Sequence, residues 1–184
     1  MNKINEKELL KTPVFTVVEK EFEGTSFKPV GLNCPEWVMV IVIDKNRKTL
    51  VVRQTRWGIE NKTIEWPCGT VEKGEEPKVA AVRELQEETG FKDVDPDRLS
   101  LLGEYNPNPA HNNNHMHAYL YSIPEMPKEF GELNLDENED CEPSVVDIDN
   151  DDLQNALLRN AMSGAAMALL YRRGIITSPN INHL

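Results

Sequence analysis

Features that would point to a membrane, secreted or nucleic-acid-binding protein are scarce in this sequence. The longest unbroken apolar run extends from Trp37 to Ile43, against the roughly 20 residues of a membrane-spanning helix. The 3 cysteines are widely spaced without a CxxC pair, which argues against a zinc site or disulfide framework and predicts a reducing cytoplasm. Lys and Arg number 20 against 31 Asp and Glu, so the net charge of −11 argues against nucleic-acid and membrane partners.

The length of 184 residues predicts one domain, because chains of about 100–200 residues usually fold as one. With 39% hydrophobic and 28% charged residues, the chain is too apolar to be disordered. We divide it into N-terminal strands at residues 1–35 and a main body at residues 36–184. Within the first part, residues 1–11 are polar and predict a frayed segment or a short helix, whereas 14–19 is rich in β-branched residues and predicts a strand.

Apolar patterning predicts several further strands. Residues 37–43 are apolar on both faces, as in a buried central strand, and 50–53 continues the chain as the second arm of a hairpin. Residues 99–105 form another predicted strand. Residues 115–121 alternate, which places Met116, Ala118 and Leu120 on one face and His115, His117, Tyr119 and Tyr121 on the other.

Two helical regions complete the pattern. Pro77 fits the first turn of a helix and Gly90 fits its C-terminal cap. Between them lies an apolar stripe formed by Val79, Ala81, Val82 and Leu85. A second helical region is predicted at 152–173, with a break near 160–164. Strands, a helix, more strands and a final helix in this order predict a mixed α+β sandwich.

An acidic cluster on the first helix is the strongest chemical feature. Glu84, Glu87 and Glu88 lie at spacings of three and four, so they project from one helix face. Like charges at this spacing destabilise an isolated helix, but divalent cations make the arrangement favourable. Carboxylates together with water and phosphate oxygens suit Mg²⁺ or Mn²⁺. Arg83 can pair with a nearby carboxylate, and Glu75 across the preceding loop is the natural candidate.

The segment 69–91 resembles the signature of the Nudix hydrolases. That signature is Gly, five residues, Glu, seven residues, and then Arg-Glu-aliphatic-any-Glu-Glu-any-Gly-aliphatic. The matching positions are Gly69, Glu75, Arg83, Glu84, Leu85, Glu87, Glu88 and Gly90, with Phe91 in the final hydrophobic position. Upstream, Arg-Gln-Thr-Arg at 53–56 and Glu-Trp-Pro-Cys-Gly at 65–69 are similar to motifs of the ADP-ribose and nucleotide-sugar pyrophosphatase branch.

The resemblance implies an α/β/α sandwich around a mixed β-sheet, with extra antiparallel N-terminal strands that pair two copies as a homodimer. It also implies metal-dependent hydrolysis of ADP-ribose to AMP and ribose 5-phosphate. Two or three Mg²⁺ or Mn²⁺ ions would be held by Glu84, Glu87, Glu88 and the main-chain carbonyl of Cys68. The signature does not determine which base or sugar the substrate carries, so hydrolysis of GDP-mannose, UDP-sugars or nucleoside triphosphates stays open. Non-catalytic binding of ADP-ribose is a second alternative.

The resemblance assigns further site residues by role. The expected catalytic residues are Glu84, Glu87, Glu88 and Arg83, with Glu139 of the acidic loop 135–142 as general base and Glu137 as second choice. The expected substrate-binding residues are Arg53, Arg56, Trp57, Glu65 and Asn114. The arginines suit phosphate oxygens, and Trp37 or Trp57 can stack on a nucleobase. For His111, His115 and His117 three roles stay open: a transition-metal site, substrate contact, or structure.

Overall fold

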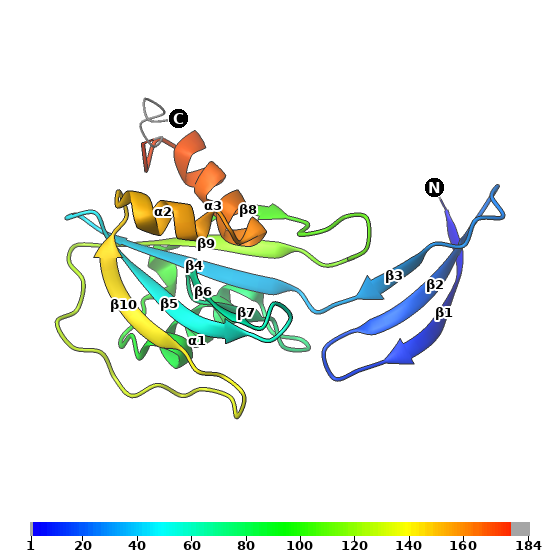
Figure 1. The fold of residues 1–184 in the computed structure, drawn as a ribbon, viewed down its shortest axis with the longest axis horizontal. Helices are drawn as coiled ribbons and strands as arrows, with labels where there is room; N and C mark the ends of the chain where they lie inside the picture. The colour runs from blue at the N-terminus through cyan, green and yellow to red at the C-terminus, as the bar shows by residue number, and fades with distance from the viewer. Residues whose placement is uncertain (1, 178–184) are drawn as a thin grey trace.

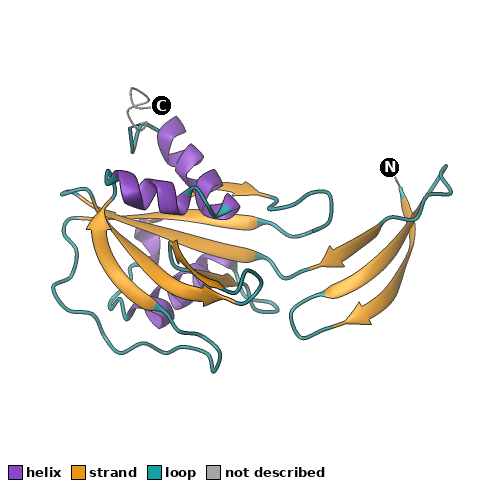
Figure 2. Ribbon diagram, in the orientation of Figure 1, coloured by secondary structure: helices purple, strands orange, loops and turns teal. Residues whose placement is uncertain are grey.

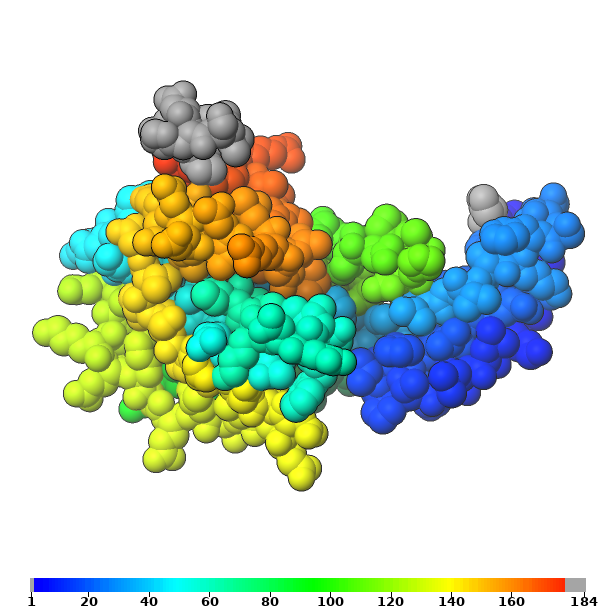
Figure 3. Space-filling view, in the orientation of Figure 1, coloured from blue at the N-terminus to red at the C-terminus, as the bar shows by residue number. Residues whose placement is uncertain are grey.

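The computed structural model describes residues 2–177. Met1 of the predicted N-terminal region and residues 178–184 of the predicted main body lie outside it. Its N-terminal part is a three-stranded antiparallel sheet of β1 (Lys3–Lys11), β2 (Thr16–Phe22) and β3 (Val30–Asn33), which projects from the main body (Figures 1 and 3). The expectation of a frayed segment or short helix at 1–11 was wrong. Every residue of β1 is exposed and most are polar, but the strand pairs with β2 from Lys3 to Lys11, and this non-local pairing sets its conformation.

The main body is built on a seven-stranded sheet. Five strands follow the order β10-β5-β4-β9-β8, while β6 pairs with β5 and β7 pairs with β4. The pair β4 and β9 is parallel and the other pairs are antiparallel, so the sheet is mixed as expected. The strands are β4 (Trp37–Asp44), β5 (Lys48–Arg56), β6 (Asn61–Glu65), β7 (Cys68–Thr70), β8 (Leu99–Tyr105), β9 (Met116–Ile123) and β10 (Glu142–Asp147). The sequence predicted the β4–β5 hairpin, β8 and β9, but not β6, β7 or β10.

Helices cover both faces of this sheet (Figure 2). The helix α1 (Pro77–Thr89) packs on one face, whereas α2 (Asp151–Leu157) and α3 (Ala161–Arg172) pack on the other. A short 3₁₀ helix, η1 (Pro96–Arg98), precedes β8. The predicted helical break is present, because the Asn160 side chain accepts the Met162 N–H and starts α3. Among residues 2–177, no helix has the length and hydropathy needed to cross a membrane.

Alternating residues of β4 and β9 build the two layers of the core. On the α2 and α3 side lie Met39, Ile41, Ile43, Met116 and Ala118. On the α1 side lie Val38, Val40, Val42, Tyr119 and Tyr121. The predicted faces of 115–121 are therefore confirmed. Burying each large apolar side chain contributes roughly 1.5–3 kcal/mol, so the two layers fix both the sheet and the helix that carries the acidic cluster.

Candidate active site

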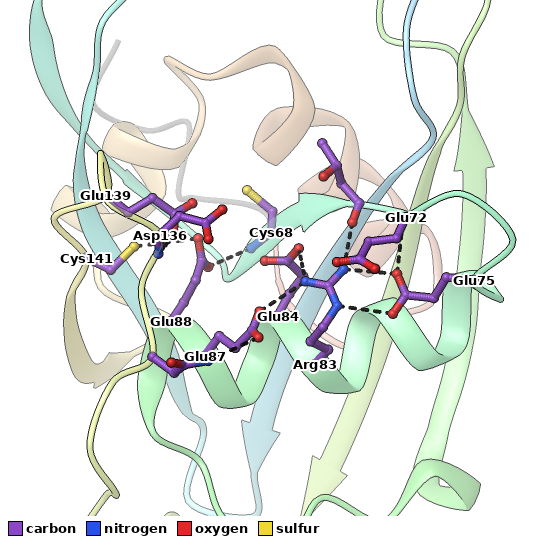
Figure 4. Close-up of polar contacts among 12 residues, drawn as sticks. Cys68, Glu72, Glu75, Arg83, Glu84, Glu87, Glu88, Asp136, Glu139 and Cys141 are labelled. Carbon is purple, nitrogen blue, oxygen red and sulfur yellow. Dashed lines mark hydrogen bonds and ion pairs between the residues drawn. The ribbon is translucent and has the colours of Figure 1, made fainter. Parts of the chain in front are cut away.

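The helix α1 is fixed by its ends and by its buried face. Pro77 occupies its first turn, and Gly90 ends it in a left-handed conformation with φ of 65°. The side chains that face the sheet and are fully buried are Ala80, Ala81 and Leu85. Val79 does not belong to this stripe, since it is 58% exposed. The buried stripe sets the rotation of the helix, and this rotation directs its glutamates toward β7 (Figure 4).

The strand β7 passes so close to α1 that residue 69 has no room for a side chain. A Cβ atom at Gly69 would lie 2.1 Å from Cδ of Glu84. The glycine therefore lets the Glu84 carboxylate lie against the strand backbone. A Cβ atom at Gly90 would similarly lie 2.3 Å from the carbonyl oxygen of Gly131, which shows how tightly the later loop lies against the helix end.

Arg83 organises the carboxylates on one side of the cluster (Figure 4). Its Nε and Nη2 atoms donate to the two oxygens of Glu75 at 3.1 and 3.0 Å, which confirms the predicted pair. Its Nη1 atom donates to Glu84 at 2.7 Å and to Glu87 at 3.0 Å. The hydrogen bonds from Arg83 lower the pKa of Glu75. The forked guanidinium thus holds three carboxylates in fixed positions.

Glu88 is the most buried carboxylate of the cluster, with 1% of its surface exposed. Its Oε2 atom accepts the main-chain N–H of Cys68 at 2.9 Å, while Nε2 of Gln54 lies 3.5 Å from Oε1. Burial, aided by the charges of Glu84 and Glu139, raises the pKa of Glu88 to about 8, although the hydrogen bond from the Cys68 N–H and the charge of Arg56 lower it. Burial also raises the pKa of Glu84. The site therefore favours binding of a cation, which would stabilise the charged carboxylates.

The loop between β9 and β10 crosses the end of α1 and brings Glu139 to the cluster. The main-chain N–H of Asn134 donates to the carbonyl of Glu87 at 3.0 Å, and that of Gly131 donates to the carbonyl of Gly90 at 2.6 Å. Further along, the N–H of Asp136 donates to Oε2 of Glu139 at 3.1 Å. The sequence predicted Glu139 at the site but did not single out Asn134 or Asp136. The acidic composition of the loop 135–142 was the one signal that could have pointed to Asp136.

A cavity of about 450 Å³ opens onto these groups. Its walls include Arg56, Cys68, Arg83, Glu84, Glu87, Asp136 and Glu139. A larger groove of about 820 Å³ lies along the outer side of α1, with Val79, Val82 and Phe91 in its walls. We assign the site to the smaller cavity, because only this one is lined by Glu84, Glu139 and Arg56, whereas the larger groove borders only Glu87 of the α1 glutamates.

Arg56 contributes a positive charge to the wall of this cavity, and Glu65 lies behind it. Nε and Nη2 of Arg56 donate to the two oxygens of Glu65, both at 2.8 Å. Glu65 is fully buried, whereas the Arg56 side chain is 39% exposed. Burial alone would raise the pKa of Glu65, but the hydrogen bonds and charge of Arg56, together with hydrogen bonds from Thr63 and Cys68, lower it overall. Glu65 therefore binds the guanidinium of Arg56 and does not itself line the cavity.

The structure does not bring Arg53, Trp57 or Asn114 to the cavity, whereas Trp37, the other predicted stacking residue, lies in its wall. Arg53 is exposed on β5, and its Nη1 atom lies 3.8 Å from Glu142. Trp57 is 72% exposed in the turn after β5. Asn114 is buried and donates to the carbonyl of Pro35 at 2.8 Å. Gln54, which contacts Glu88, is a site residue that the sequence analysis missed; it lies within the Arg-Gln-Thr-Arg motif.

The donor set fits a hard divalent cation. Glu84, Glu87 and Glu88 supply carboxylate oxygens, the ligands that Mg²⁺ and Mn²⁺ prefer. Within the described chain, no Lys or Arg side chain hydrogen-bonds to Glu88, so a cation would stabilise its charged form. Arg83 bridges Glu84 and Glu87 here, and no three His, Cys, Asp or Glu groups in residues 2–177 are already arranged as a metal site.

Comparisons with known proteins place these residues in a family. The NUDIX domain model matches residues 35–162. The chain is 30% identical over 145 residues to the ADP-ribose pyrophosphatase of Bacillus subtilis (strain 168), across 74% of this chain and 77% of that protein. It is 34% identical over 116 residues to the methanol dehydrogenase activator of Bacillus methanolicus, across 63% of this chain and 60% of that protein.

A solved structure of an ADP compounds hydrolase shares the fold, with a TM-score of 0.65 and 21% identity over 95% of this chain and 96% of that one. The similarity therefore extends over the projecting N-terminal sheet as well as the main body. The matched region also contains the whole signature at 69–91. The chain belongs to the NUDIX family, which confirms the predicted fold and the assignment to the Nudix pyrophosphohydrolases.

Proposed function

We propose that this enzyme hydrolyses the pyrophosphate bond of ADP-ribose and releases AMP and ribose 5-phosphate. The observation that carries the proposal is the set of carboxylates around one cavity, contributed by α1 and by the loop before β10. The cavity also contains Arg56, whose positive charge suits a phosphate oxygen. Similarity to the ADP-ribose pyrophosphatase of Bacillus subtilis supports this choice of substrate.

The proposed ligands of two or three Mg²⁺ or Mn²⁺ ions are Glu84, Glu87, Glu88 and the main-chain carbonyl of Cys68. When bound, such ions offset the charge of the pyrophosphate and make a water molecule more acidic. Hydrogen bonds within the protein restrict where these carboxylates lie. Arg83 positions Glu84 and Glu87, and the Cys68 N–H positions Glu88.

The remaining steps are assigned to side chains around the cavity. Glu139 accepts the proton of the water that attacks phosphorus, because its carboxylate lines the cavity and is close enough to Glu84 and Glu88 to raise their pKa values. Arg56 binds the phosphate oxygens and stabilises the charge that develops on them. Glu65 keeps the guanidinium of Arg56 in one orientation. Glu137 is the second choice for the base, although it does not line the cavity.

We also propose that residues 1–35 pair two copies of the chain, with residues 36–184 as the hydrolase domain. The N-terminal sheet supports this idea because it exposes apolar side chains that a single copy leaves in water, namely Ile4, Leu9, Leu10, Phe27 and Val30. Light scattering should give the mass of a dimer for the full chain. The free thiols of Cys34, Cys68 and Cys141 fit the proposed location in the cytoplasm.

A substrate panel tests the proposed reaction. The purified enzyme with Mg²⁺ is offered ADP-ribose, GDP-mannose, UDP-glucose and nucleoside triphosphates, and the products are identified by chromatography. Release of AMP and ribose 5-phosphate with the highest kcat/KM supports the proposal. Faster hydrolysis of another compound would reassign the substrate, and binding of ADP-ribose without turnover would support a sensor.

A further inference from the structure

A second group of imidazole and carboxylate side chains lies outside the catalytic cavity. His117 is in β9, and Glu104 lies opposite it in β8. His115 immediately precedes β9, and Glu36 immediately precedes β4. Because β4 and β9 are paired in parallel from Trp37 and Met116 onward, the residues just before them are also neighbours. We call Glu36, His115, His117 and Glu104 the His–Glu cluster.

The distances within the His–Glu cluster are those of direct contacts. Nε2 of His117 lies 3.1 Å from Oε2 of Glu36, and its Nδ1 lies 3.3 Å from Oε1 of Glu104. Nδ1 of His115 lies 3.7 Å from Oε1 of Glu36. The His117 side chain is only 13% exposed and is held between strands, whereas that of His115 is 51% exposed and has room to turn.

The two contacts of His117 compete when its ring is neutral. A neutral imidazole carries one N–H, so it can donate to only one of two carboxylates, and its other nitrogen then presents a lone pair to an acceptor. In the tautomer that donates from Nδ1 to Glu104, the Nε2 lone pair faces Glu36. A histidine that donates one ring N–H to a carboxylate and offers the other nitrogen to an ion is a recurrent arrangement at metal sites. A cation between His117 and Glu36 would remove the conflict.

The spacing also matches that of two ligands on one ion. Tetrahedral zinc binds nitrogen and oxygen at about 2.0–2.1 Å, which places two of its ligands about 3.3 Å apart. The separation of 3.1 Å between Nε2 of His117 and Oε2 of Glu36 is close to this value. No three donors in residues 2–177 already surround a point. The exposed His115 must therefore turn onto the ion to complete the set.

We propose that Glu36, His115 and His117 bind one Zn²⁺ or another late first-row transition metal ion, with Glu104 orienting His117. Imidazole nitrogens favour Zn²⁺, Cu²⁺ and Ni²⁺ over Mg²⁺, so this site differs in chemistry from the all-carboxylate catalytic cluster. The proposed metal site would join β8 and β9 to the segment that links the N-terminal sheet to β4. The carbonyl of Glu36 also accepts the N–H of Val71, so the ion would stabilise the segment that leads into the signature loop.

Zinc binding by the full-length, metal-stripped protein tests this site. The titration contains millimolar Mg²⁺ to occupy the catalytic carboxylates, and free Zn²⁺ is followed with a chromophoric chelator while thermal unfolding is measured in parallel. The wild-type chain should bind about one Zn²⁺ and unfold at a higher temperature with it. His117→Ala should weaken this binding by at least about 100-fold, and Glu104→Gln by about 10–100-fold.

His111→Ala is the matched control, because His111 is an exposed histidine of the preceding loop outside the His–Glu cluster. It should bind Zn²⁺ like the wild type. His117→Gln guards against misfolding, since circular dichroism must show a folded chain that has lost the zinc-dependent rise in unfolding temperature. Equal zinc affinity in the wild type and in both His117 variants would overturn the proposal. A wild-type chain that binds no Zn²⁺ in the presence of Mg²⁺ would also overturn it, and would identify the cluster as an ion pair.

Discussion

Buried Glu88 should make the metal-free protein less stable as the pH rises, and Glu88→Gln should remove this effect. Burial raises the pKa of Glu88 from 4.5 to about 8 in the folded chain. Between these values the folded chain keeps a proton that the unfolded chain has lost. Folding stability therefore falls as the pH increases through this window, because the folded state binds more protons.

The size of the effect follows from the two pKa values. The whole window corresponds to about 4–5 kcal/mol of unfolding free energy, at about 1.36 kcal/mol for each pH unit. Between pH 6 and pH 8 the loss is about 2 kcal/mol, since half of the Glu88 side chains have ionised at the upper limit. Glutamine cannot ionise, and its amide oxygen can still accept the N–H of Cys68, so the fold should tolerate it.

Urea unfolding at pH 6 and pH 8 in the presence of a chelator measures this difference. Wild type should lose about 2 kcal/mol more than Glu88→Gln over this interval. The control Glu129→Gln, at an exposed loop position, should behave like wild type. Added Mg²⁺ should reduce the loss in wild type, because a cation favours the charged carboxylate. Equal pH dependence in wild type and Glu88→Gln without metal would refute the argument from burial.

Three other substitutions test separate parts of the site. Glu139→Gln should remove the acidic limb of the pH–rate profile, and retention of that limb would exclude Glu139 as the base. Glu65→Gln should raise KM about tenfold with a smaller change in kcat, because Arg56 loses a charged hydrogen-bond partner; an unchanged KM would count against its positioning role. Gly69→Ala should reduce kcat by about 100-fold in a folded chain, as its Cβ would displace Glu84; normal turnover would show that Glu84 can move without cost.

Apart from Arg56 and Glu139, which the resemblance to the Nudix hydrolases supplied, the parts of the site that the sequence predicted are local. Pro77, the spacing of the glutamates and the capping Gly90 all belong to one helix and its end, so the same short segment predicted both the helix and its acidic face. The faces of β9 were also predictable, because Met116 and Tyr119 alternate between two apolar layers. The Arg83–Glu75 pair followed from its position across one short loop.

The parts that the sequence did not predict depend on distant pairing. The strand β1 is exposed throughout, lacks an alternating apolar pattern, and forms only because β2 lies beside it. The edge strand β10 has mostly exposed residues and lacks a clear alternation. The same limit applies to Glu65 and Gln54: nothing in the local sequence shows that the first lies behind Arg56 or that the second contacts Glu88.

Turnover of ADP-ribose by Glu87→Gln is the most direct test of the central claim that the α1 carboxylates perform metal-dependent pyrophosphate hydrolysis. Glu87 lines the cavity and its side chain is 31% exposed, so the substitution should leave the fold intact. The measurement is kcat with Mg²⁺ and identified products. We predict that wild type releases AMP and ribose 5-phosphate and that the variant is slower by about 100-fold or more. Near-normal turnover by a folded Glu87→Gln protein would contradict the account.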